Sequence, residues 1–257
     1  MIIAIDVGNT NIVIGSIENG VIESSARIST NRSGTAYELA MAVSSALEFD
    51  RVDPAQAEGA IISSVVPNVT ETLKRALAIM GIKKILTVGS GLKTGLNIRI
   101  DDPAQLGSDM VVGAVAALDM VKPPMLIIDM GTATTISAID RDGAFRGGAI
   151  IPGVGLSLNA LAGGASLLPK VSIEAPPHAI GTNTVDCMQS GAVLGAACMI
   201  DGLLEKMEEE LGSPCSVVAT GGLSVVVIPL CRRKDIILEP DLLLKGLSVI
   251  WDKNVKK

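Results

Sequence analysis

The sequence predicts an α/β protein built from two related lobes, each with a mixed sheet flanked by helices. Two observations point to this duplicated fold. A pattern of strand, acidic turn, strand, hairpin turn and strand occurs at 4–29 and again at 126–151, and helical segments follow each copy. A third observation is composition, because 48% of the 257 residues are hydrophobic but only 2% are aromatic. A chain of this kind buries a sizeable core, which here must be aliphatic.

The two copies of the pattern match position by position. Asp6 follows the first apolar run, IIAI, and aligns with Asp129 at an offset of 123 residues. The glycine two residues after each acid keeps this offset, and so do the glycines of the second turn, Gly20 and Gly143. Asn-Gly and Asp-Gly pairs favour tight hairpins because these residues tolerate a positive φ. A fixed offset at three positions indicates an internal duplication.

Four segments outside these strands are predicted to be helices: 35–50, 68–81, 182–212 and 241–251. The second has a threonine and a glutamate near its start and a glycine at its end, the third ends in glutamates and a glycine, and the fourth follows a proline. These are common boundary signals of helices. In the third helix, Gly191 and Gly195 share one face, where they would let another helix pack closely.

The boundary between the lobes is expected near the short connection MVKPPM at 120–125, which contains two prolines. A chain of 257 residues is long enough for one large domain or two small ones. Because the repeated pattern begins once on each side of this connection, two domains are the better description. We therefore predict an N-terminal lobe at 1–119 and a C-terminal lobe at 120–257.

Charge and composition exclude several classes of protein. The formal net charge is −6 and the basic residues are not clustered, which argues against nucleic-acid binding. The cysteines form no CxxC pair, and the single histidine, His178, argues against a Ser–His–Asp hydrolase. The longest apolar helical run, GAVLGAACMI, is too short to span a bilayer, and no secretion signal precedes the first strand. We expect a cytoplasmic protein with reduced thiols that binds neither nucleic acid nor membrane.

The polar turn after the first strand of each copy suggests a phosphate site. Turns of glycine and small polar residues expose backbone N–H groups that can approach phosphate closely. A carboxylate in such a turn repels phosphate unless a cation lies between them. Asp6 and Asp129 therefore indicate a bound metal ion, or a water ordered by a cation, beside a nucleotide. The turns also supply hydroxyl donors, namely Thr10, Thr132 and Thr134.

These two acidic hairpins, with the later strand and Gly-Gly turn VVATGGLS (217–224), resemble the superfamily of sugar kinases, heat-shock chaperones and actin. That resemblance implies two lobes of the ribonuclease-H-like, or actin-like ATPase, fold. Further motifs narrow it: DVGNTN, SSVVP, KTGLNI, PAQLGSD, DMGTATT, GGAIIPG, GTNTVDCMQSG, ATGGL and LKGL occur in this order. As a set they are similar to type III pantothenate kinase across nearly the whole chain.

The resemblance implies an enzyme that transfers phosphate from ATP to pantothenate, giving 4'-phosphopantothenate in the first step of coenzyme A biosynthesis. It assigns the catalytic carboxylate to Asp109, which would take or orient the proton of the pantothenate hydroxyl. It implies a monovalent cation, K⁺ or NH₄⁺, at Asp129, and a divalent cation, Mg²⁺, at Asp6, directly or through water. The ATP contacts that it implies are Asp6, Val7, Gly8, Asn9, Thr10, Asn11, Ile12, Val13, Thr132, Gly221 and Gly222.

On the substrate side, the chain departs from the family at two positions. The implied contacts are Ile100, Gly107, Ser108, Asp109, Met110 and Thr184. Met110 stands where the family commonly has an arginine, and Ile100 where it often has a tyrosine. Losing an Arg–carboxylate fork removes a strong and geometrically specific contact. The substrate carboxylate then needs another cation, such as Arg99, or the substrate differs.

Several alternatives stay open from the sequence. Asp109 precedes the apolar run MVVGAVAALDM, so it is also placed to cap a helix. The protein is a pantothenate kinase, a non-catalytic nucleotide-binding regulatory relative, or a kinase of another small hydroxyl substrate. Helix 182–212 carries more apolar surface than one face needs, which predicts a homodimer. The resemblance places Thr184, at the start of this helix, near the dimer interface.

Overall fold

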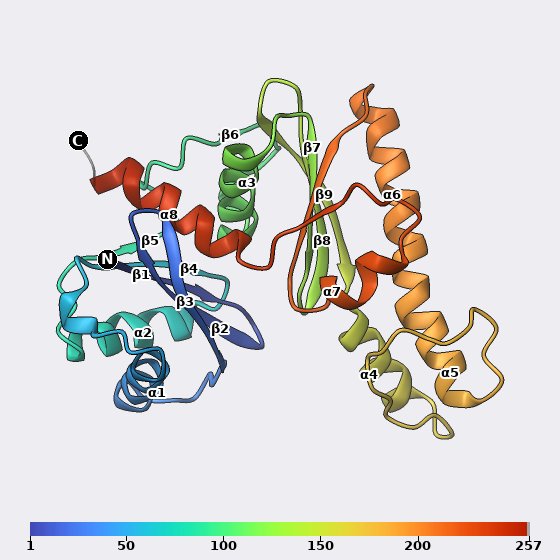
Figure 1. Ribbon diagram of the computed structural model, residues 1–257, viewed down its shortest axis with the longest axis horizontal. Coiled ribbons are helices and arrows are strands. Elements are labelled where there is room, and N and C mark those ends of the chain that lie inside the picture. Colours follow the sequence, from blue (N-terminus) through green and yellow to red (C-terminus); the bar gives the residue numbers. More distant parts are fainter. Residues whose placement is uncertain (256–257) are drawn as a thin grey trace. The chain divides into compact units, whose positions relative to one another are not determined.

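The computed structural model describes residues 1–255, and the chain divides into two compact units (Figure 1). Unit 1 comprises Met1–Leu96, Asp101–Asp119 and the C-terminal segment from Asp241 onward. Unit 2 comprises Asn97–Ile100 and Met120–Pro240. The chain therefore returns to unit 1 for its last helix. The domains expected at 1–119 and 120–257 stay a prediction.

Unit 1 contains a five-stranded mixed sheet with the order β3-β2-β1-β4-β5. Its strands are β1 (Ile2–Val7), β2 (Asn11–Glu18), β3 (Val21–Ser29), β4 (Ala60–Ser64) and β5 (Ile85–Thr87). The first three form an antiparallel meander, and β4 and β5 extend it in parallel from β1. β1 is an unbroken apolar run up to Asp6 because it is buried on both faces.

Helices cover both faces of this sheet (Figure 1). On one face lie α1 (Ala36–Phe49) and α2 (Pro67–Ile79), whose Val43, Leu47 and Leu73 share an aliphatic core with Ile3 and Ile5. On the other lies α8 (Leu242–Val255), which packs against β1 and β4. Unit 1 also contains α3 (Ser108–Met120) and two short 3₁₀ turns, η1 (Pro54–Gln56) and η2 (Pro103–Gln105).

The boundaries of α1 and α2 illustrate two kinds of start signal. Thr35 caps α1 through a capping box, in which the Glu38 N–H donates to Thr35 and the Thr35 N–H donates to the Glu38 carboxylate at 2.7 Å. The helix predicted at 68–81 is α2, and the threonine and glutamate near its predicted start lie inside its first two turns. That helix begins earlier, at Pro67, because proline needs no N–H partner in a first turn.

Unit 2 repeats the sheet of unit 1 with one strand added. Its order is β11-β10-β7-β8-β9-β6, and the order from β9 to β11 is that of β3 to β5. The strands are β6 (Asn97–Ile98), β7 (Met125–Met130), β8 (Ala133–Ile139), β9 (Ala144–Pro152), β10 (Ser216–Thr220) and β11 (Ile237–Leu238). β6 joins the free edge of β9 in parallel. The duplicated α/β fold predicted from the sequence is confirmed.

The helices of unit 2 are dominated by one long rod from Thr184 to Leu211. It runs as α5 (Thr184–Gln189), a π-helical turn η3 (Ser190–Leu194) and α6 (Gly195–Leu211), and ends at Gly212 with φ +69°. The others are α4 (Val154–Gly164), α7 (Ser224–Val227) and the 3₁₀ turn η4 (Ile228–Leu230). Ala197, Ile200 and Leu204 of α6 pack on the apolar side chains of β7 and β10.

The glycines of the long rod do not act as predicted within the described chain. A Cβ added to Gly191 would meet nothing within 4 Å, and one added to Gly195 would meet only the Ser190 carbonyl at 3.9 Å. No other described segment therefore packs closely on these two positions. The expected helix–helix approach at Gly191 and Gly195 is wrong for this chain, and both lie in or beside the π-helical turn.

The helix predicted at 182–212 is confirmed as the rod Thr184–Leu211. Its 28 residues are long and apolar enough to cross a membrane by length and composition alone, and 44% of its most apolar window is buried inside the protein. One such helix is weak evidence for a membrane span, because core helices of soluble proteins pass the same test. The buried Asp201 within the rod accepts hydrogen bonds from the chain that packs beside it.

Candidate active site

The first acidic hairpin lies at the end of β1 in unit 1. Asp6, which is 9% exposed, lies opposite Val13 of β2 and Ser63 of β4. The Gly8 N–H donates to the Asn11 carbonyl at 2.9 Å, which closes the turn. The Thr30 hydroxyl donates to the Gly8 carbonyl at 2.7 Å and fixes the turn to the end of β3. The polar residues predicted to hold phosphate therefore form a hairpin tied to the sheet.

The second acidic hairpin, at the end of β7 in unit 2, is one residue shorter. Asp129 lies opposite Thr135, six residues on, whereas Asp6 lies opposite a residue seven positions on. The Gly131 N–H donates to the Ala133 carbonyl at 3.0 Å, and the Gly153 N–H donates to the Thr132 carbonyl at 3.1 Å. The β8–β9 connection is longer in compensation, so the offset of 123 residues returns at the hairpin glycine.

Beside Asp129, the Gly-Gly turn after β10 closes on the second hairpin. Gly221 has φ +89°, and a Cβ there would lie 2.6 Å from a carboxylate oxygen of Asp129 and 2.5 Å from the Met130 nitrogen. The Leu223 N–H donates to the Met130 carbonyl at 3.3 Å. Glycine is required here both for the left-handed backbone and for the close approach. Unit 2 therefore brings Gly221 against Asp129, two of the residues predicted to lie near the nucleotide.

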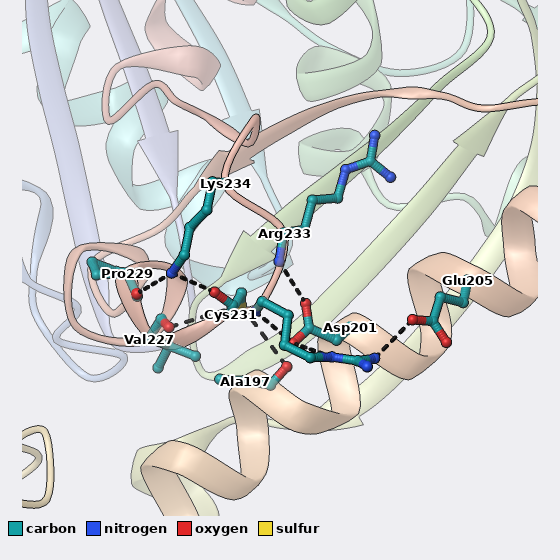
Figure 2. A network of polar contacts seen from close by, with 9 residues as sticks. Ala197, Asp201, Glu205, Val227, Pro229, Cys231, Arg233 and Lys234 are labelled. Carbon is teal, nitrogen blue, oxygen red and sulfur yellow. Dashed lines mark hydrogen bonds and ion pairs between the residues drawn. The ribbon is translucent and has the colours of Figure 1, made fainter.

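The segment that leads from this turn to β11 is anchored on α6 (Figure 2). The buried Asp201 carboxylate accepts the backbone N–H groups of Arg232 and Arg233 at 2.8 and 3.3 Å. Lys234 donates to the Pro229 and Cys231 carbonyls at 3.0 and 2.7 Å. Burial raises the pKa of the Cys231 thiol to about 11, so it stays a protonated, unreactive packing group at neutral pH. This anchoring role of Asp201 was not predicted. An acidic residue inside an apolar helix was the sequence signal that could have indicated it.

Asp109 lies in the first turn of α3, in unit 1, and is half-buried. One carboxylate oxygen accepts the N–H of the next residue, Met110, at 2.8 Å. A capping side chain instead accepts an N–H two or three residues on, so this bond is not the one expected of a helix cap. A Cβ on Gly107 would occupy the position of the same carboxylate oxygen, which explains the glycine. Burial raises the pKa of Asp109, although the Met110 N–H opposes that shift.

Hydrogen bonds bring Asp109 and Asp6 to the same edge of the unit 1 sheet. The Val65 N–H donates to the Val7 carbonyl at 3.1 Å, which joins the segment after β4 to the end of β1. The Ser108 hydroxyl donates to the Ser64 carbonyl at 2.9 Å, which joins the start of α3 to the end of β4. The carboxyl ends of neighbouring strands in an open α/β sheet are the usual place for ligands.

The other predicted substrate contacts lie on different elements. Thr184 is the first residue of α5 and lines an apolar pocket of about 780 Å³. That pocket is lined also by Leu158, Leu161, Leu168, Met188 and Gly191, among others. Ile100 follows β6 in unit 2, where its side chain lies 4.0 Å from the position of a Cβ on Gly147. Arg99, considered as a replacement cation, has its guanidinium 3.6 Å from the Asp142 carboxylate, an exposed ion pair.

The donor set fits a cation that is held partly by phosphate. Among residues 1–255, no cluster of three or more His, Cys, Asp or Glu side chains could hold a metal ion. Mg²⁺ in kinases is usually held by one or two carboxylates together with substrate phosphates and water, and the buried Asp6 could supply one such carboxylate. At Asp129, the carboxylate lies against the Gly221 turn, where no side chain would fit.

Comparison with solved structures gives the class of protein. Component A of the (R)-2-hydroxyglutaryl-CoA dehydratase of Acidaminococcus fermentans matches with a TM-score of 0.58 and 15% identity, over 99% of this chain and 98% of the other. An archaeal actin homolog matches with a TM-score of 0.51 and 12% identity, over 98% and 99%. With its two acidic hairpins and doubled sheet, the protein has the actin-like ATPase fold predicted from its sequence.

Sequence comparison then gives the family. A model described as type III pantothenate kinase matches residues 2–206. The type III pantothenate kinase of Moorella thermoacetica is 37% identical over 254 residues, 99% of this chain and 100% of that protein. The enzyme of the same name from Geobacillus sp. (strain WCH70) is 40% identical over 258 residues, 100% and 99% of the two chains. The chain belongs to the type III pantothenate kinase family.

Proposed function

We propose that this protein transfers a phosphoryl group from ATP to pantothenate, giving 4'-phosphopantothenate at the first step of coenzyme A biosynthesis. Membership of the family over the full chain supports the reaction. The observation that carries it is the position of Asp109, a half-buried carboxylate at the sheet edge where the Asp6 hairpin lies. A regulatory relative has no need of a desolvated carboxylate at that place.

Each part of the site has a role in this proposal. In unit 1 the hairpin Asp6–Val13 is proposed to contact ATP, and in unit 2 the proposed ATP contacts are Thr132 and Gly221–Gly222. Asp109 orients the substrate hydroxyl and takes its proton as the oxygen attacks the γ-phosphorus in line. Asp6 would hold Mg²⁺ and Asp129 a monovalent cation, and these ions would neutralise charge on the phosphates when bound. The chain's own residues do the positioning.

The substrate side rests on fewer residues than is common in the family. Met110 carries no charge to hold the pantothenate carboxylate, and Arg99 is paired with Asp142. We propose that a homodimer supplies contacts that one chain lacks, with Thr184 beside the substrate near the interface. The apolar Thr184 pocket and the exposed Leu161, Leu167 and Ile180 support an interface in this region of unit 2.

Steady-state ADP release with and without pantothenate tests the function. We expect turnover that requires pantothenate and a product that mass spectrometry identifies as 4'-phosphopantothenate. ATP binding without turnover on any acceptor would instead identify a regulatory relative. Turnover on a different hydroxyl compound, with none on pantothenate, would make Met110 and Ile100 determinants of a new specificity.

A further inference from the structure

The residue before Asp109 bonds to the end of β4, where the Thr70 hydroxyl of α2 also reaches Ser64. The Ser108 hydroxyl lies 2.9 Å from the Ser64 carbonyl oxygen, 2.9 Å from the Ser64 nitrogen and 3.2 Å from the Ser63 hydroxyl. Ser63 is fully buried. The Thr70 hydroxyl of α2 donates to the Ser64 hydroxyl at 2.6 Å. The two serines of the SSVVP motif, which end the apolar strand β4, are the sequence signal of this cluster.

The protons of this cluster can be assigned by counting. A serine hydroxyl has one proton to donate and two lone pairs to accept with. The Ser64 carbonyl only accepts, so the single Ser108 proton goes there. The Ser64 N–H only donates, and it fills one lone pair of Ser108. The Ser63 hydroxyl must then be the donor to the second lone pair. The Ser108 hydroxyl is saturated, and it has no hydrogen bond left to offer a substrate.

This arrangement fixes the start of α3 to the sheet. Ser108 is the first residue of α3 and bonds to both backbone groups of the last residue of β4. The neighbouring Val65 N–H bonds to the Val7 carbonyl of β1. The Asp109 carboxylate therefore projects from a helix start that is tied, through Ser64 and Val65, to the strand that carries Asp6.

We propose that Ser63 and Ser108 are positioning residues for Asp109, acting through the backbone at the start of α3 and without contact between their hydroxyls and the substrate. This inference rests on the proposed role of Asp109 as the catalytic carboxylate. A displacement of about 1 Å at a catalytic group can reduce the rate on the order of 100-fold. The loss should fall on kcat, because the ATP hairpins do not include these serines.

The test compares Ser108→Ala and Ser63→Ala with the wild type. We expect kcat to fall roughly 10- to 100-fold for Ser108→Ala, while KM for ATP changes less than about twofold. Ser63→Ala, which removes one of the three bonds, should lose less. Ser108→Thr keeps the hydroxyl and should restore most of the rate. A rise in KM for pantothenate with kcat unchanged would show instead that the Ser108 hydroxyl contacts the substrate.

The matched control is Ser16→Ala, because Ser16 is also buried in unit 1 and its hydroxyl pairs with that of Ser24 at 2.8 Å, on β2 and β3. Its kcat should be that of the wild type, even if its melting temperature falls as far as that of Ser108→Ala. Equal kcat losses in the Ser16→Ala and Ser108→Ala variants would show that Ser63 and Ser108 contribute only to the stability of the fold.

Adding Ser108→Ala to Asp109→Asn should cause no further loss, since the serine acts through the carboxylate. A further multiplicative loss would contradict the inference. Failure of the proposed function is separate, because it appears as a wild-type protein without pantothenate-dependent turnover. Wild-type turnover with an unchanged Ser108→Ala variant overturns the positioning role alone.

Discussion

Asp109 shows how burial can adapt a single side chain for chemistry. It is half-buried in the first turn of α3, where loss of water raises its pKa. One carboxylate oxygen is engaged by the Met110 N–H, and Gly107 leaves room for it. A structural acid gains nothing from such a place, because desolvation works against its charge. A general base gains a stronger affinity for the proton that it must remove.

We predict that Asp109→Asn reduces turnover by roughly 100- to 10,000-fold while ATP still binds. The amide keeps the shape of the side chain but cannot take a proton. Because the folded pKa is raised, stability is highest below the free-aspartate pKa, and part of it is lost as pH rises through the folded pKa. The variant should therefore melt at the same temperature as the wild type or higher at neutral pH. Near-wild-type turnover in a folded variant contradicts the assignment.

The acid limb of the pH profile should report the same group. Asp109 must be ionised to act, so kcat/KM should fall as pH decreases through its raised pKa. That limb is expected above the value of about 3.9 for a free aspartate. Steady-state kinetics across the acid range measure this limb. The activity of the enzymes used to detect ADP is checked separately at each pH. A limb at or below the free value would show that Asp109 is not the group being titrated.

Among the elements, the hairpins and the Gly-Gly turn carry the nucleotide site. The hairpins share their acid and glycine, but the second is one residue shorter at its tip. Only the second hairpin has the Gly221 turn against it, where a side chain would collide with Asp129. The two hairpins therefore differ in the segment that packs against each of them.

We predict that Gly221→Ala abolishes measurable ATP binding, because its Cβ would force Asp129 and Met130 away. Gly212→Ala is the control. Gly212 has φ +69° and open space around it, so alanine there adds only backbone strain, on the order of 1–2 kcal/mol. Calorimetric titration with a non-hydrolysable ATP analogue and thermal melts separate the two effects. Equal ATP affinity in both variants would remove Gly221 from the nucleotide site.

For the whole molecule, the duplication places one acidic hairpin in each unit, and we predict that activity needs two kinds of cation. Each carboxylate lies in a turn that we propose holds phosphate, and a carboxylate repels phosphate unless a cation lies between them. Rates should vanish with a divalent chelator and depend on whether K⁺, NH₄⁺ or Na⁺ is the monovalent ion. Equal rates in all three buffers, down to trace cation, would remove the monovalent site from Asp129. The variant Asp129→Asn should lose the monovalent dependence.

A second prediction for the whole molecule is a homodimer at assay concentration, measured by light scattering. Thr184 lines an apolar pocket, and nothing within 4 Å covers the position of a side chain at Gly191. The variant Gly191→Arg should therefore yield folded monomers with reduced activity. The matched control is Gly202→Arg on the same rod, another glycine whose Cβ position is open. A fully active monomeric wild type would contradict the prediction.

Local sequence patterns were enough to predict the repeated meander, the acidic hairpins, the glycine turns and most helices. These depend on the spacing of apolar residues and on turn chemistry, which act over a few positions, as at Asn19–Gly20 with φ of 51° and 82°. The folded structure was needed to show that β6 extends the second sheet, that α8 packs on β1, and that Ser108 bonds to Ser64, 44 residues away. Such contacts join segments that are distant in the sequence, and the local spacing of residues does not indicate which of these segments will be in contact.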